Sequence, residues 1–264
     1  MNSRVGKSVW ASIAIDEVAE DSESVGFMTH LVRMALALVL LPFSWVTTWA
    51  FLSRFSHATV EQGFWQSPQF WYFTIGSLVM LGWFWSRLGQ SIFLYIYVFG
   101  HELTHAAFVK CFGGKILEMK WGAEGGYVTT DKSNWVISLS PYFVPFWTLM
   151  SVVVHVLTGF FFEYSATMNL FFYGVVGATW TFHLAWTLWM IPKDQPDLQD
   201  NGTFLSLVLI YFGNLLVLIT LVCLASPSPL ESLEGFGNAW LRTATIWVHN
   251  SIDWLTGFAE LVLR

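Results

Sequence analysis

The segment His101-Glu102-Leu103-Thr104-His105 contains two histidines four positions apart. On an α-helix this spacing places both imidazoles on one face, one turn apart, where both can bind a single Zn²⁺ ion. The Glu102 carboxylate is then placed to accept a proton from metal-bound water as a general base. We therefore predict that His101 and His105 are zinc ligands and that Glu102 is catalytic.

The surroundings of this motif favour a functional site over a packing role. The motif lies in the apolar run from residue 91 to residue 112. Ionisable side chains are costly in lipid unless they are paired or line a cavity. The alternative is that these polar residues only contribute to helix packing.

A catalytic zinc ion normally has three protein ligands and one open position, so a third ligand is expected elsewhere. The polar interruption at residues 192–202 offers Asp194, Asp197 and Asp200. Irregular backbone at membrane depth is tolerated where it is buried in protein or lines a cavity. We favour Asp197, which follows Pro196, keep Asp200 as the nearest alternative and place Asp194 behind both. The competing interpretation is that these acids are solvated and cap the next helix.

His183 lies about two turns before the same interruption. It is an alternative third ligand, a hydrogen-bond partner of a ligand, an oxyanion stabiliser or a packing residue. The sequence leaves these four roles open.

The composition is that of a membrane protein. Hydrophobic residues make up 55% of the chain and charged residues 11%, whereas soluble domains carry about 25% charged residues. Several apolar runs are long enough to cross a bilayer. We predict an α-helical polytopic membrane protein with about six transmembrane helices, at residues 31–52, 70–85, 91–112, 135–162, 166–191 and 203–225. Ser140-Pro141 and Pro145 predict a break near the start of the span at residues 135–162.

These spans divide the chain into three parts. A polar tail, residues 1–30, precedes a membrane-embedded core, residues 31–225. Residues 226–264 have apolar positions at helical spacing with polar residues between them, which indicates an amphipathic helix lying in the membrane interface. The lipid bilayer is the expected partner, nucleic-acid binding is not indicated, and the oligomeric state is left open.

A small β-hairpin is expected directly after the motif. Residues 115–121 alternate between two faces, glycines follow, and Tyr127 to Thr130 are β-prone. This pattern predicts two antiparallel strands. Because an isolated hairpin is only marginally stable, we expect it to lean on the membrane core. The alternative is an amphipathic loop.

An ordered series of short motifs carries a family resemblance. The two histidines and Glu102 are followed by Ala106-Ala107, by Cys111-Phe112-Gly113-Gly114-Lys115, by Gly125-Gly126, by Ser140-Pro141 and by an Asp- and Gly-containing break. Over about residues 101–204 the chain resembles the site-2 protease family of intramembrane zinc metalloproteases. The family's usual Leu-Asp-Gly is spread over residues 192–202 here, which leaves the third ligand open.

The resemblance implies Zn²⁺ as the cofactor and hydrolysis of peptide bonds in a transmembrane or membrane-associated protein substrate. A substrate helix must unwind to expose its carbonyls, and the hairpin is expected to hold the unwound segment by strand addition at Gly125, Gly126 and Tyr127. The rival functions are another metal-dependent membrane hydrolase and a non-proteolytic zinc-binding scaffold or transporter.

Overall fold

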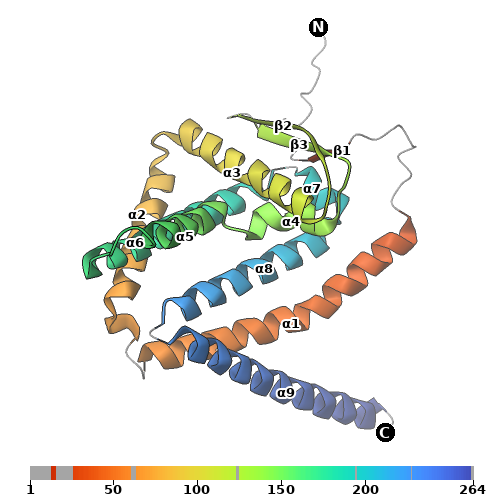
Figure 1. Cartoon of the computed structure of the whole chain (residues 1–264). Coiled ribbons are helices and arrows are strands. Elements are labelled where there is room, and N and C mark those ends of the chain that lie inside the picture. The colour runs from red at the N-terminus through yellow and green to blue at the C-terminus, as the bar shows by residue number, and fades with distance from the viewer. Residues whose placement is uncertain are drawn as a thin grey trace.

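The structure is a computed structural model that describes residues 13–15, 26–60, 64–122, 125–193, 195–226 and 228–262. Most of these residues are helical, as predicted. The helices are α1 (Phe27–Val60), the 3₁₀ helix η1 (Phe64–Gln66), α2 (Pro68–Ser86), α3 (Gln90–Cys111), α4 (Trp135–Phe143), α5 (Phe146–Gly159), α6 (Ala166–Met190), α7 (Pro196–Asp200), α8 (Thr203–Leu224) and α9 (Pro229–Val262). The strands are β1 (Ile13–Ile15), β2 (Ile116–Gly122) and β3 (Gly125–Thr130), and Figure 1 places them together on one side of α3.

Within the described residues, three helices are long and apolar enough to cross a membrane. They are the part of α1 from Phe27 to His57, α3 and α8. The pair α4 and α5 would be a fourth span if the two helices are counted together. The chain therefore has the character of a membrane protein. The predicted spans at α2 and α6 form helices of 19 and 25 residues, which are long enough to cross a membrane but are less apolar than the three helices above.

The predicted span at residues 135–162 is broken in two. α4 and α5 meet at an angle of 73°, and Val144 between them is extended, with φ −93° and ψ 107°. Pro145 follows immediately, and a proline disfavours helical conformation in the residue before it. The break predicted at Pro145 is confirmed, and a single continuous helix over this range is excluded.

The turn between α2 and α3 orients the helix that carries the histidines. α2 ends at Arg87, whose φ of 58° is in the left-handed region, and Gly89 has a φ of 66°. Left-handed residues of this kind end a helix and let the chain reverse within a few residues. α3 therefore begins at Gln90, almost without a loop.

Glycines bring α2 and α6 into backbone contact. A Cβ atom on Gly76 would lie 2.0 Å from the Gly174 carbonyl oxygen, and one on Gly177 would lie 2.1 Å from the Phe73 carbonyl oxygen. Small residues at such a crossing let helix backbones approach closely, as is common in membranes. This contact gives α6, which carries His183, a fixed place against α2.

The hairpin predicted after α3 is confirmed, and the loop alternative is excluded. β2 and β3 pair antiparallel from Ile116↔Thr130 to Gly122↔Gly125, with an irregularity between Ile116 and Glu118. Both strands pack on α3. The sheet also contains β1, which was not predicted and which pairs in parallel with β3.

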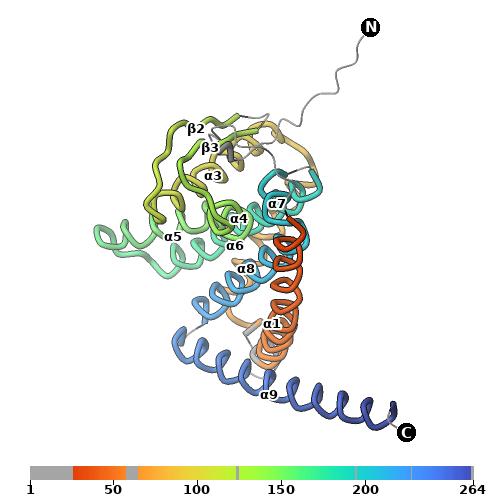
Figure 2. Tube along the Cα trace, turned by 90° about the vertical axis from the view of Figure 1, so that its right-hand side faces the viewer, coloured from red at the N-terminus to blue at the C-terminus, as the bar shows by residue number. Residues whose placement is uncertain are grey.

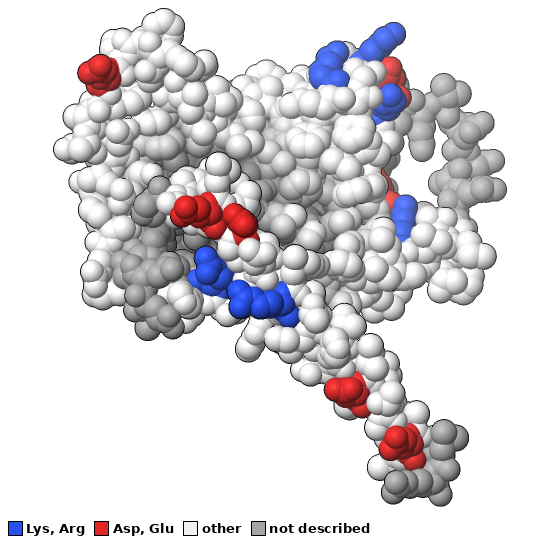
Figure 3. All heavy atoms as spheres, turned by 60° about the horizontal axis from the view of Figure 1, so that its bottom comes forward, with Lys and Arg blue, Asp and Glu red and all other residues white. Residues whose placement is uncertain are grey.

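The predicted C-terminal helix is present as α9. Its first part packs against α1 and α8, and its last part runs away from the rest of the molecule in Figures 1 and 2. Apolar side chains stay exposed along it, among them Leu241, Trp254 and Phe258. Figure 3 shows acidic side chains at intervals along the projecting end, and broad uncharged areas over the rest of this side of the molecule. Its position in the membrane interface stays a prediction.

Candidate metal centre

The two histidines of the motif lie together inside the protein, on the second half of α3. The ring centroids of His101 and His105 are 4.9 Å apart, and the two side chains are 6% and 0% exposed. The predicted one-turn geometry on a single helix face is therefore present.

Asp197 approaches this pair from α7. Its Oδ2 atom lies 3.9 Å from His101 Nε2 and 3.6 Å from His105 Nε2. One potential ligand atom from each of the three residues lies within 4.8 Å of the others, and all three side chains are buried. The group could hold a metal ion, and it contains the aspartate favoured from the sequence.

Local interactions explain why Asp197 faces inward. Pro196 occupies the first turn of α7, where a missing N–H costs nothing. Leu198 is buried against α4 and α8 residues, and its carbonyl accepts a hydrogen bond from Ser206 Oγ at 3.1 Å. Asn201 Nδ2 donates to the Asp197 carbonyl at 2.9 Å. These hydrogen bonds and the packing of Leu198 fix the position of the short helix and of its aspartate.

The other aspartates of the interruption do not join this group. Asp200 is exposed at the end of α7, and it is absent from the ligand cluster found among the described residues. Asp194 lies outside the described residues.

His105 is held in one orientation by the backbone of α4. Its Nδ1 donates a hydrogen bond to the Ile137 carbonyl oxygen at 2.8 Å. A proton on Nδ1 leaves Nε2 with its lone pair, and Nε2 is the atom directed at Asp197. A second hydrogen bond of this kind typically fixes the tautomer of a metal-binding histidine.

Several buried polar atoms at this point have no hydrogen-bond partner within the described part of the chain. They are both ring nitrogens of His101, Nε2 of His105 and Oε2 of Glu102. Buried polar atoms are paired in the great majority of cases, so a concentration of unpaired ones requires a reason. A cation among them would bind one nitrogen of each histidine and one oxygen of the aspartate, and a donor set of two imidazoles and one carboxylate suits zinc.

Tyr142 and Gln195 complete the surroundings of the aspartate. The Tyr142 hydroxyl lies 3.1 Å from Asp197 Oδ2 and 3.1 Å from Gln195 Oε1, so its one proton is shared between these two acceptors. Both residues are buried. Neither residue was predicted from the sequence. Pro141 indicated a helix break, but no local pattern indicates that the next residue is a partner of the aspartate.

The hairpin touches the predicted base. A Cβ atom on Gly126 would lie 2.7 Å from Glu102 Cγ and 2.8 Å from Glu102 Oε1. The same Cβ atom would lie 2.8 Å from the Lys120 carbonyl oxygen, so a larger residue would have to shift the 1% exposed Glu102 carboxylate, the β2 backbone or both. The predicted close approach of backbone at Gly126 is therefore present, while its role in substrate binding stays a prediction.

Tyr127, the third predicted binding residue, has its hydroxyl engaged elsewhere. It donates a hydrogen bond to Glu118 Oε1 on β2 at 2.7 Å. This hydrogen bond to a carboxylate raises the pKa of the Tyr127 hydroxyl above its ordinary value. The predicted role of Tyr127 in substrate binding stays a prediction.

His183 is buried on α6 and shares a small pocket with His101. Its neighbours include the Tyr142 carbonyl and the Asn214 side chain, and its Nε2 has no hydrogen-bond partner among the described residues. It is not in the three-residue ligand group. Its predicted roles beside the ligands stay predictions.

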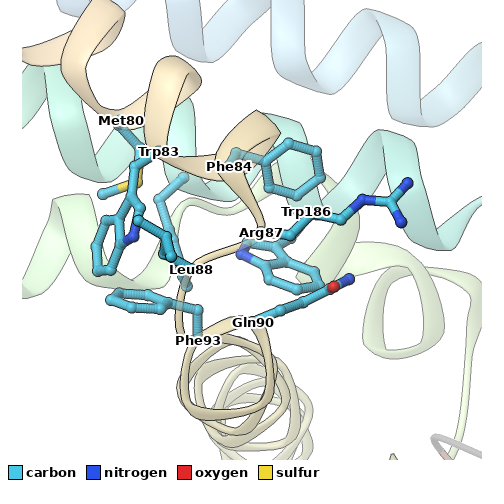
Figure 4. A pocket seen from close by; sticks show the side chains of 9 residues that line it. Met80, Trp83, Phe84, Arg87, Leu88, Gln90, Phe93 and Trp186 are labelled. Carbon is cyan, nitrogen blue, oxygen red and sulfur yellow. The ribbon is translucent and has the colours of Figure 1, made fainter.

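A larger pocket lies at the turn between α2 and α3, away from the ligand group. Its walls are mainly aromatic, with Trp83, Phe84, Phe93 and Trp186 among the lining residues (Figure 4). Its polar lining residues are Arg87 and Gln90 together with the indole N–H groups, and it offers no carboxylate or histidine. This pocket has no groups for metal-dependent chemistry.

Comparisons with protein-family models, with curated proteins and with solved structures found no match for this chain.

Proposed function

We propose that this protein is an intramembrane zinc metalloprotease of the site-2 protease kind, which hydrolyses peptide bonds of membrane-spanning substrates. The observation that carries the proposal is the convergence of His101, His105 and Asp197, with their ligand atoms within 4.8 Å of one another. Glu102, from the same helix turn, stands beside them with one oxygen unpaired.

In this proposal His101, His105 and Asp197 would hold Zn²⁺. When bound there, the ion would lower the pKa of a water molecule and polarise a scissile carbonyl. Glu102 accepts the proton of the attacking water and returns it to the leaving amine. Tyr142 orients the Asp197 carboxylate, and the Ile137 carbonyl orients His105.

The proposal places this site inside the bilayer. α3 is among the three helices able to cross a membrane, and the histidines lie in its second half. We take α2, α6 and the bent pair α4–α5 to complete a multi-pass bundle, because α2 and α6 are apolar and joined through glycines. α7 then supplies the carboxylate at a break that is buried in protein rather than exposed to lipid.

The hairpin supports a peptide substrate in particular. Gly126 lies against Glu102, so an extended chain paired with β3 would pass the base. Strand addition uses backbone hydrogen bonds and tolerates many side chains. This suits a substrate helix whose unwound segment varies in sequence.

The second candidate function is a zinc-binding scaffold or transporter that cleaves nothing. It shares the ligand group and has no need for an unpaired carboxylate beside the ligands. The orphaned Oε2 of Glu102 is the feature that favours hydrolysis.

One pair of variants separates the candidates. Glu102→Gln should keep zinc, measured by plasma emission on purified protein, and should lose cleavage of a reconstituted transmembrane substrate, because an amide cannot take the proton. Glu163→Gln, the same chemical change at an exposed residue after α5, is the matched control and should retain both. Loss of zinc in Glu102→Gln would make Glu102 a ligand, and full cleavage would remove it from the mechanism.

A further inference from the structure

The sheet contains a strand from a distant part of the chain. β1 pairs in parallel with β3 in the register Ile13↔Val128, Ala14↔Thr129 and Ile15↔Thr130. β3 therefore lies between β2 on one side and β1 on the other. Without β1, this side of β3 would present a row of unpaired N–H and C=O groups, which is a template for any extended peptide.

The same strand reaches the candidate metal centre at its other end. Gly125, Gly126 and Tyr127 precede the residues that pair with β1, and Gly126 lies against Glu102. A peptide in the register of β1 that extends two or three residues further at its N-terminal end would lie opposite Gly126, beside Glu102. β1 and such a peptide need the same edge, and an edge accepts one strand at a time.

The pairing of β1 is suited to displacement. It covers three residue positions, and short, isolated strand pairings are marginally stable. Only residues 16–26 separate β1 from the first residue of α1. A short tether of this kind gives a weak partner a high effective concentration, so it can compete with a substrate that arrives from outside.

We infer that this edge of β3 is the peptide-binding surface and that residues 13–15 occupy it as an internal competitor. The partner is an extended peptide recognised through its backbone. The apparent affinity for such a peptide falls as the fraction of molecules in which β1 occupies the edge rises. The consequence for cleavage rests on the proposed protease function, whereas the competition for the edge does not.

The test uses the full chain with two adjacent prolines, Ala14→Pro and Ile15→Pro combined. Successive N–H groups of a strand point to opposite sides, so the double change removes whichever one faces β3. The matched control is Ala14→Val with Ile15→Val, which keeps residues that favour strands. Zinc content is measured in parallel and should be equal in all three proteins, because the ligands lie on α3 and α7.

Two readouts do not require cleavage. Amide hydrogen exchange at residues 128–130 should be faster in the proline protein than in the wild type and the valine protein. A labelled synthetic peptide of residues 8–20 of this chain should bind the proline protein about threefold or more tightly than the other two, since the competent fraction rises. Thr129→Pro added to the proline protein should abolish this binding.

The third readout is cleavage of a reconstituted transmembrane substrate, which should rise in the proline protein by a similar factor. Unchanged exchange at residues 128–130 would overturn the inference, as would faster exchange without tighter peptide binding. Tighter peptide binding without cleavage by any of the proteins would support the edge as a peptide site and contradict the proposed protease function instead.

Discussion

The hydroxyl of Tyr142 gives a quantitative test of the metal centre. Tyr142→Phe keeps a buried aromatic ring of nearly the same volume and deletes the donor that lies 3.1 Å from Asp197 Oδ2. Hydrogen bonds to charged groups contribute about 1.5–3 kcal/mol. Partners that orient metal ligands typically contribute about 10- to 100-fold in metal affinity. We expect zinc affinity to fall by about one order of magnitude or more, because each 1.4 kcal/mol corresponds to about a tenfold change.

The assay is a competitive titration of purified protein with a chromophoric zinc chelator. Tyr211→Phe is the matched control, because its hydroxyl also makes a hydrogen bond, to Thr48 at 2.7 Å, but on a different pair of helices. The control should bind zinc as the wild type does. Equal affinity in Tyr142→Phe and the wild type would show that the Asp197 carboxylate is not oriented by this tyrosine, and it would weaken the case for Asp197 as a ligand.

Three further predictions concern the ligands and the hairpin. The wild-type protein should contain about one zinc per chain by plasma emission, and His101→Ala and His105→Ala should each lose most of it, with helical content by circular dichroism retained; equal metal in the double variant and the wild type would refute the site. Gly126→Ala should lower cleavage by about tenfold or more with zinc retained, because its Cβ would lie 2.8 Å from Glu102 Oε1, whereas Gly122→Ala meets nothing closer than 3.7 Å and should behave as the wild type. Thr129→Pro should likewise reduce cleavage by more than about tenfold at normal zinc content, and a wild-type rate would remove the hairpin from the mechanism.

The parts of the structure that were predictable from sequence depend on local patterns. The one-turn spacing of His101 and His105 fixed their common face, because helix geometry alone determines it. The glycines and alternation after α3 indicated the hairpin, and Pro145 marked the break between α4 and α5. Each of these features follows from residues within a few positions of one another.

The parts that were missed depend on residues far apart in the chain. The Tyr142 hydroxyl meets an aspartate 55 positions later, and β1 meets β3 across more than a hundred residues. No periodicity or turn signal encodes such a meeting. The membrane spans show a different limit. α2 and α6 are rich in Trp and Tyr, which pack well but lower the mean hydropathy. The apolar runs there predicted the helices correctly, but they do not establish that these helices cross a membrane.

The three candidate ligands come from a continuous helix and from a one-turn helix at a break, and this division has a mechanical consequence. The histidines are held by the whole of α3, and the Nδ1 of His105 is tied to α4. Asp197 depends on a five-residue helix, held by Ser206, Asn201 and Tyr142. A short helix has few internal hydrogen bonds of its own, so these side-chain contacts determine where the carboxylate lies. Metal affinity should therefore fall more in variants with changes around α7 than in variants with changes of similar size on α3 away from the two histidines.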